Sequence, residues 1–255
     1  MKNAIERRLE IYETIQRDGK KSVNELSDMF NVSYVTIRSD LRLLENNGHI
    51  IRSHGAAMPN VGLVTELNIK EKQTLNCENK RKIGKVAASL IHEYDSIIID
   101  SGTTTKAIIP FIKHIENLTV MTNGLDIAVD LSSISGVEVL MPGGKLRKGA
   151  LSFSGPQAEK SLKNYSFKKI FLGVDGFDLR SGITTHNEQE ASLNRLLCDI
   201  SAEVIALADS SKFNKHSCHM IRGFGDIDIL ISDSGIPPKY LKELRSTGVE
   251  VIIVD

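Results

Sequence analysis

The C-terminal two thirds of the chain alternates short aliphatic runs with helical patterns. The aliphatic runs lie at 96–99, 118–122, 137–141, 169–173, 204–208, 227–232 and 249–254. Apolar residues at helical spacing lie between most of them, near 124–132, 156–164, 187–201 and 238–246. Strands that alternate with helices in this way form a parallel sheet covered by helices. We therefore predict an α/β domain with a mainly parallel sheet over residues 78–255.

The N-terminal segment has a different pattern, and a chain of 255 residues has room for a second, smaller domain. Residues 3–18 carry apolar side chains at helical spacing, and a second short helix follows Ser22, where Glu25 completes a capping-box pattern. After a tight break a third helix runs from Ser33, and residues 50–56 are typical of a short β-hairpin. This order predicts a winged helix-turn-helix domain over residues 3–58, followed by a linker at 59–77.

A winged helix-turn-helix domain places its third helix in the major groove of DNA and its wing on the backbone or the minor groove. Arginine pairs with guanine, hydroxyl groups reach base edges or phosphates, and tyrosine packs on a thymine methyl group. The candidate DNA-contacting residues are those that the core does not need. They are Ser33, Tyr34, Thr36, Arg38, Ser39 and Arg42 on the third helix, and Arg52 and His54 on the wing.

The charge of the chain gives little support to DNA binding. Lys and Arg number 32, as do Asp and Glu, and residues 1–60 hold nine basic and eight acidic residues. Neutralisation of DNA phosphates supplies most nonspecific affinity for DNA. The predicted N-terminal DNA-binding domain, called the head below, has a net charge of only +1 over residues 1–60 and therefore attracts DNA weakly. A protein partner of the head therefore stays open as an alternative to operator DNA. If the partner is DNA, we expect a homodimer or homotetramer, because two linked heads that bind one operator together bind it more tightly than one head does.

Polar residues follow the predicted strands of the larger domain, and the carboxyl ends of parallel strands meet at one edge of a sheet. A Gly- and Thr-rich loop that opens a helix binds phosphate through its N–H groups, although the same residues also cap ordinary turns. We expect Lys212 to neutralise a phosphate, and Lys145 and Arg147 to be solvated charges. The candidate ligand-binding residues are Asp100, Ser101, Gly102, Thr103, Thr104, Thr105, Asn123, Gly124, Gly144, Asp175, His186, Asn187, Glu188 and Lys212.

The run Val-Ser-Tyr-Val-Thr-Ile-Arg-Ser-Asp-Leu-Arg-Leu-Leu-Glu at 32–45, with the wing at 52–56, closely resembles the DeoR family of bacterial sugar-responsive regulators. Ala56 stands where the wing of the family has its second glycine. The resemblance implies a transcriptional regulator, a repressor, that binds operator DNA. The three widely spaced cysteines, none in a CxxC pair, favour a cytoplasmic location. It also implies a sensor domain that is similar to ribose-5-phosphate isomerase and binds a phosphorylated sugar as effector.

Within the family, residues 171–195 are most similar to regulators of N-acetylgalactosamine utilisation, and residues 161–167 and 209–214 agree with this. This likeness implies that the effector is an amino-sugar phosphate, such as galactosamine 6-phosphate or its N-acetyl form.

The alternative function is a sugar-phosphate isomerase-like enzyme that carries a DNA-binding head. Isomerisation through an enediolate needs a base and a cation that stabilises the oxyanion. Glu188 or Glu190 would supply the base, but no lysine lies between Arg180 and Lys212, so the sequence predicts no local cation. We therefore expect binding without turnover, with no catalytic residue, cofactor or metal. No apolar run approaches the roughly 18 residues of a membrane span, so no membrane partner is expected.

Overall fold

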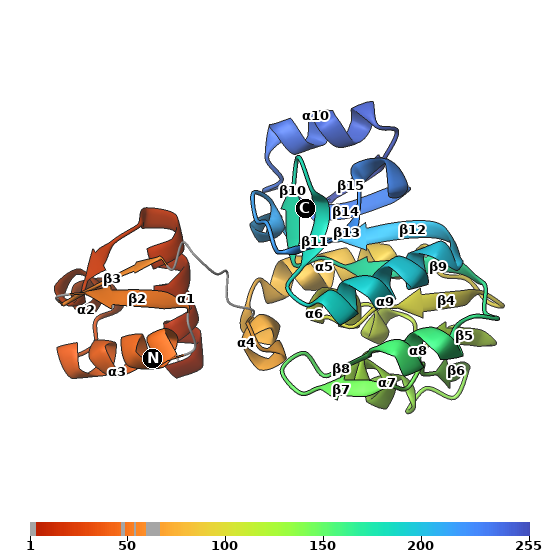
Figure 1. Ribbon diagram of the computed structural model, residues 1–255, viewed down its shortest axis with the longest axis horizontal. Coiled ribbons are helices and arrows are strands. Elements are labelled where there is room, and N and C mark those ends of the chain that lie inside the picture. The colour runs from red at the N-terminus through yellow and green to blue at the C-terminus, as the bar shows by residue number, and fades with distance from the viewer. Residues whose placement is uncertain (1–3, 47–48, 54, 60–66) are drawn as a thin grey trace. The chain divides into compact units, whose positions relative to one another are not determined.

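The computed structural model describes residues 4–46, 49–53, 55–59 and 67–255. The chain divides into two compact units, Met1–Leu75 and Asn76–Asp255, and each is described by itself (Figure 1). The candidate wing residue His54 lies outside the described residues.

Three helices form the core of the first unit: α1 (Ala4–Asp18), α2 (Val23–Phe30) and α3 (Tyr34–Asn46). The predicted capping box is confirmed, because the Ser22 hydroxyl accepts from the Glu25 N–H and the Glu25 carboxylate accepts from the Ser22 N–H. Asn31 ends α2 in the left-handed region with φ 50°, which turns the chain directly into α3. Side chains from all three helices fill the core between them, including Ile11, Ile15, Leu26, Ile37 and Leu41.

The predicted wing is confirmed as a hairpin of β2 (Ile50–Ser53) and β3 (Ala56–Pro59). A two-residue strand that was not predicted, β1 (Lys21–Ser22), pairs with β3 and ties the wing to the start of α2. The hairpin turn requires a positive φ at Gly55, where φ is 76°. Ala56 already belongs to β3 and is buried, so the alanine at the position of the second family glycine fits without backbone strain.

The described part of the predicted linker contains a helix, α4 (Ile69–Thr74). Asn68 caps this helix by a reciprocal capping box with Glu71, and Ile69 is buried. Glu71 lies 3.8 Å from the buried His49, measured from Oε1 to Nε2, and α4 also contacts α1. The sequence of this segment lacks strong periodicity because a six-residue helix is too short to show it.

The second unit is built on a seven-stranded sheet in residues 76–255, all of which the structure describes. Its strands are β4 (Ser96–Ile99), β5 (Leu118–Met121), β6 (Val137–Leu140), β9 (Phe167–Gly173), β12 (Ser201–Leu207), β14 (Ile229–Asp233) and β15 (Glu250–Val254). Their order is β15-β14-β12-β9-β4-β5-β6, and every neighbouring pair is parallel. The predicted strands and the parallel sheet are thus confirmed, with small shifts at the strand ends.

Helices cover both faces of this sheet, as strands of aliphatic residues require. The helices are α5 (Cys77–Ala88), the single turn α6 (Thr103–Lys106), α7 (Leu125–Leu131), α8 (Pro156–Ser161), α9 (Glu188–Asp199) and α10 (Pro238–Ser246). Because successive side chains of a strand point to opposite faces, Ile97 and Ile99 pack with residues of α5 and α7, whereas Ile98 packs with residues of α8, α9 and α10.

Two small antiparallel sheets that were not predicted follow the ends of β6 and β9. One is the hairpin of β7 (Lys145–Arg147) and β8 (Ser152–Ser154). The other contains β10 (Gly176–Asp178), β11 (Gly182–Thr185) and β13 (His219–Arg222). Both are inserted at the carboxyl edge of the parallel sheet, where they add side chains to the loops of that edge.

Candidate functional site

The face of α3 that points away from the core carries most of the predicted DNA-contacting residues. Ile37 is fully buried, whereas Tyr34, Arg38, Ser39 and Arg42 are exposed. Ser33 precedes the helix, and its hydroxyl accepts from the Thr36 N–H at 3.2 Å. The Ser33 and Thr36 hydroxyls also lie 2.9 Å apart, so these two residues cap the helix. The helix therefore presents its polar stripe to solvent, as a groove-reading helix does.

Arg52 has a more specific role than the predicted phosphate contact. Its Nε lies 3.1 Å from Oε2 of Glu45, and its backbone N–H donates to Oε1 of the same carboxylate. This pair clamps the wing to the C-terminal part of α3. A cleft of about 310 Å³ between α3 and the wing is lined by the arginines at 38, 42 and 52, among other residues.

The orientation of α3 depends on a buried ion pair that the sequence did not predict. Asp40 is buried, and its Oδ2 lies 2.7 Å from Nε of Arg7 on α1. Arg8 approaches the same carboxylate at 4.0 Å. A buried charge is tolerated only when it is paired, so Asp40 fixes the third helix to the first.

In the second unit, the strand order places a switch point between β4 and β9. From these two neighbouring strands the chain continues outward in opposite directions, and ligands of parallel α/β sheets bind at such a point. Asp100 directly follows β4 there and is buried. Its Oδ2 accepts from the Gly173 N–H at 3.1 Å and from the Asn194 amide at 3.3 Å. Burial and then the Glu190 carboxylate raise the pKa of Asp100 to about 7, and hydrogen bonds oppose this only in part.

The loop after Asp100 is joined to the loop after β5. The Ser101 N–H donates to Oδ1 of Asn123 at 2.8 Å, and the Asn123 amide donates to the Ser101 hydroxyl at 3.3 Å. A Cβ on Gly124 would lie 3.3 Å from Cα of Ser101, so a glycine suits this close approach. Other candidates lie in the same loop, where Gly102 and Thr103 are half-buried, and Thr104 and Thr105 are buried.

A second group of polar side chains adjoins Asp100. The Thr185 hydroxyl contacts Oδ2 of Asp175 at 3.0 Å and Oε2 of Glu190 at 3.3 Å. Arg147 of β7 forms an ion pair with the buried Glu190. The prediction that Arg147 is a solvated charge is therefore wrong, because the β7–β8 hairpin brings it to the sheet edge. The predicted absence of a local cation is wrong for the same reason.

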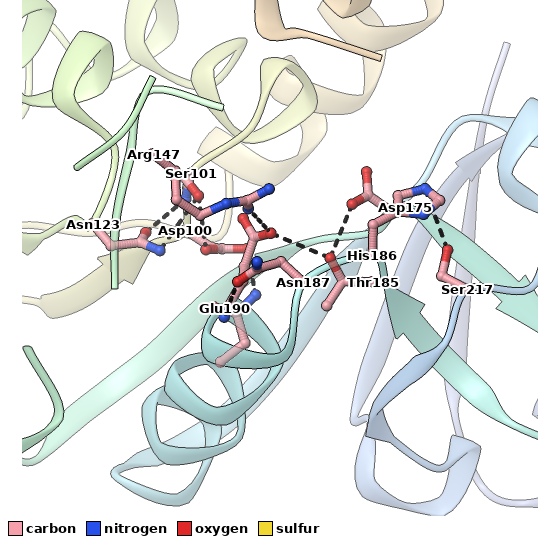
Figure 2. A network of polar contacts seen from close by, with 11 residues as sticks. Asp100, Ser101, Asn123, Arg147, Asp175, Thr185, His186, Asn187, Glu190 and Ser217 are labelled. Carbon is pink, nitrogen blue, oxygen red and sulfur yellow. Dashed lines mark hydrogen bonds and ion pairs between the residues drawn. The ribbon is translucent and has the colours of Figure 1, made fainter. Parts of the chain in front are cut away.

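Figure 2 shows the resulting network, in which Asp100, Ser101 and Asn123 lie at one end, Glu190 and Arg147 in the middle, and Asp175, His186 and Ser217 at the other. His186 Nε2 lies 3.3 Å from the Ser217 hydroxyl, and Oδ1 of Asn187 accepts from the Glu190 N–H at the start of α9. The predicted Glu188 is exposed. The buried carboxylate of this helix is that of Glu190.

The remaining candidates lie apart from this network. Gly144 has φ 100°, and a Cβ at this residue would lie 2.7 Å from the Ser154 carbonyl oxygen. A glycine is therefore required here by the backbone conformation and the close contact. Lys212 follows β12 beside the buried Asp209. Burial raises the pKa of Asp209, but the charges of Lys212 and Lys80 and the Ser211 hydrogen bonds outweigh it, and the net pKa is lowered. In the described part of the chain, no hydrogen bond or ion pair joins Lys212 to Asp100.

Sequence reasoning missed Arg147, Asn194, Lys80 and the role of Glu190. Glu190 and Asn194 lie four residues apart on α9, and both are buried. Polar residues at buried positions of a helical repeat are a signal that the sequence contains. Arg147 carries no such signal, because its partner lies 43 positions away.

Comparison with known families identifies both units. Residues 7–60 match the DeoR-like helix-turn-helix domain, and residues 75–234 match the DeoR C terminal sensor domain. The chain belongs to the DeoR family. Like its relatives, this DeoR-family chain is a DNA-binding transcriptional regulator, and the resemblance predicted from residues 32–45 is confirmed.

Two relatives extend over almost the whole chain. A protein of Escherichia coli O157:H7, named as an aga operon transcriptional repressor, is 44% identical over 98% of this chain and 93% of its own length. The uncharacterized regulator YulB of Bacillus subtilis strain 168 is 36% identical over 98% of this chain and 96% of its own length.

Among solved structures, ribose 5 phosphate isomerase A from Neisseria gonorrhoeae is similar over 54% of this chain and 53% of its own. The identity is 13% and the TM-score 0.39, values too low to carry a function across. No helix among the described residues is long and apolar enough to cross a membrane.

The raised pKa of Asp100 predicts how stability depends on pH. The folded state keeps the Asp100 proton up to about pH 7, whereas the unfolded chain loses it near 3.8, so this group's contribution to stability is full below 3.8 and falls as pH rises toward 7. The difference corresponds to about 4 kcal/mol at most. Urea unfolding of the full chain between pH 4.5 and 8 should show a shallower fall in stability for Asp100→Asn than for the parent chain. Identical slopes would show that burial of Asp100 does not perturb its titration.

Proposed function

We propose that this DeoR-family chain represses an operon for the use of a sugar or an amino sugar, such as galactosamine or N-acetylgalactosamine. Residues 3–58 bind operator DNA, residues 78–255 bind a sugar-phosphate effector and form the homodimer or homotetramer, and residues 59–77 connect the two. The observation that carries this proposal is the exposed polar face of α3 in a chain 44% identical to a protein named as an aga operon repressor.

In the proposed complex, α3 lies in the major groove. Arg38 and Arg42 are exposed on one face of α3 and reach guanine edges or phosphates. Tyr34 packs on a thymine methyl group. Arg52 holds the wing against α3 through Glu45, so its loss also changes the position of the wing. Because the head is nearly neutral, two heads must bind together for high affinity.

The proposed effector binds at the carboxyl edge of the parallel sheet. The N–H groups of the loop at 102–105 bind the phosphate, and Asp175, His186 and Asn187 contact sugar hydroxyls. Lys212 supplies a positive charge at the neighbouring strand end. These roles are supported by the switch point between β4 and β9, where ligands of parallel sheets gather.

A hydrogen bond connects this edge of the sheet to the first residue of the second unit. Asn76 is the first residue of the second unit, and its amide donates to Oδ1 of Asp209 at 2.9 Å. Asp209 opens the loop that contains Lys212. An effector that binds this loop differently in two arrangements of the chain shifts their populations by its difference in affinity. Through the bond between Asp209 and Asn76, this change in population also alters the arrangement of the segment that precedes Asn76.

The DNA-binding role predicts the effect of a double substitution. Arg38→Ala with Arg42→Ala removes two contacts worth about 1–3 kcal/mol each, so specific retardation of the upstream promoter should weaken about a hundredfold or more. Arg17→Ala is the matched control, because Arg17 is exposed at the end of α1, outside α3. Unchanged binding by the double variant would refute DNA reading by α3 and favour a protein partner for the head.

The effector role predicts a selective loss for Lys212→Ala. The concentration of sugar phosphate needed to change DNA binding should rise about tenfold, as for one lost charged hydrogen bond. DNA binding without added sugar phosphate should stay the same. Lys163→Ala, an exposed lysine after α8, serves as the control. An unaltered response of the Lys212 variant would exclude this residue from the phosphate site.

The enzyme alternative gains one observation from the structure. Glu190 and Arg147 place a carboxylate beside a cation, which are the two groups that isomerisation needs. We expect no conversion of ribose 5-phosphate or galactosamine 6-phosphate by the purified chain, since its relatives are named as transcriptional regulators. Turnover that disappears in Glu190→Gln but persists in Glu93→Gln would instead establish the enzyme.

A further inference from the structure

Two carboxylates, those of Asp100 and Glu190, lie in the buried part of the polar network. Burial, and then the Glu190 charge, raise the pKa of Asp100. Glu190 is paired with Arg147. Among the described residues, Asp100 has no ion pair, and its partners are N–H and hydroxyl groups. A buried carboxylate without a cation is costly, and a cationic group placed beside it removes that cost.

A second observation points to a ligand at the same place. Asn194 is 3% exposed, and its Oδ1 has no hydrogen-bond partner among the described residues. Its amide nitrogen donates to Asp100, so the unpaired oxygen lies beside that carboxylate. Asn194 follows Glu190 by one helical turn, which places both side chains on one face of α9.

The hairpin that carries Arg147 adds a further unpaired group. Ser152 of β8 is directly opposite Arg147 in the antiparallel register, so both side chains lie on the same face of the hairpin. Ser152 is fully buried, and among the described residues its hydroxyl has no partner. Buried polar groups are nearly always hydrogen-bonded, so these unpaired atoms indicate that a polar ligand completes the site.

We propose that Asp100, Glu190 and Asn194 bind the free amino group of an amino-sugar phosphate, which makes this site selective for an ammonium over an acetamido or a hydroxyl group. This inference rests on the proposed effector-binding function. An ammonium has three N–H donors, and the site offers three acceptors, namely two carboxylates and the Asn194 oxygen. A hydroxyl group is neutral and leaves the repulsion between the carboxylates in place. An acetamido group is neutral as well, offers a single N–H and adds a carbonyl acceptor.

Calorimetric titration of the full chain with three sugar phosphates tests this inference. Galactosamine 6-phosphate, N-acetylgalactosamine 6-phosphate and galactose 6-phosphate differ only in the group at one carbon. We expect the free amine to bind about tenfold or more tightly than the other two, as a charged hydrogen bond implies. Equal or tighter binding of the N-acetyl or hydroxyl compound would overturn the inference while leaving the proposed function intact. If none of the sugar phosphates binds, the proposed function itself fails.

Variants locate the selectivity. Asp100→Asn keeps the shape of the side chain and removes its charge, so it should abolish the preference for the amine over galactose 6-phosphate. Glu93→Gln removes an exposed carboxylate before the amino end of β4 and is the matched control. If Asp100→Asn does not fold, as judged by circular dichroism, Asn194→Asp provides the opposite test, since an added carboxylate should strengthen the preference. Retention of the full preference in Asp100→Asn, or its loss in Asn194→Asp, would overturn the inference.

Discussion

The hydrogen bonds between Asp100, after β4, and the end of the neighbouring strand β9 determine where the candidate ligand site of the second unit lies. The Asp100 N–H donates to the Phe171 carbonyl at 3.0 Å, and the Asp100 carboxylate accepts from the Gly173 N–H. These two hydrogen bonds hold the carboxyl ends of β4 and β9 together at the switch point of the strand order. The loops after β4 and β5 follow strands that end at this edge, and α9, which follows β11 of a small antiparallel sheet, adds Asn194 beside the same buried carboxylate.

Much of the fold was predictable because its signals are local. Seven aliphatic runs separated by helical patterns require a parallel sheet with two covered faces, and the register of Ile97, Ile98 and Ile99 confirms both faces. The capping box at Ser22 and the wing likewise depend on residues close in sequence. What escaped prediction was short: β1, α4 and the small sheets contain too few residues to show a period.

The candidate site was predictable only in part, for a different reason. Asp100, Ser101 and Asn123 follow strands, so a parallel sheet alone brings them together. Arg147 and Glu190 meet because a hairpin folds back over the edge, and no local pattern records that pairing. The prediction named Glu188 as a ligand-binding residue, whereas the buried carboxylate is that of Glu190. The two residues lie on different faces of α9, and the sequence does not show which face the core covers.

The ion pair between Arg7 and Asp40 has a mechanical consequence for regulation. Turning α3 against α1 would separate the buried Asp40 carboxylate from the guanidinium of Arg7 and leave it without its ion pair. This contact ties α3 to α1, so the two helices keep their relative orientation within the first unit. In the homodimer or homotetramer proposed above, an effector would therefore act by displacing whole N-terminal domains, and the spacing of two operator half-sites would select the arrangement that binds DNA.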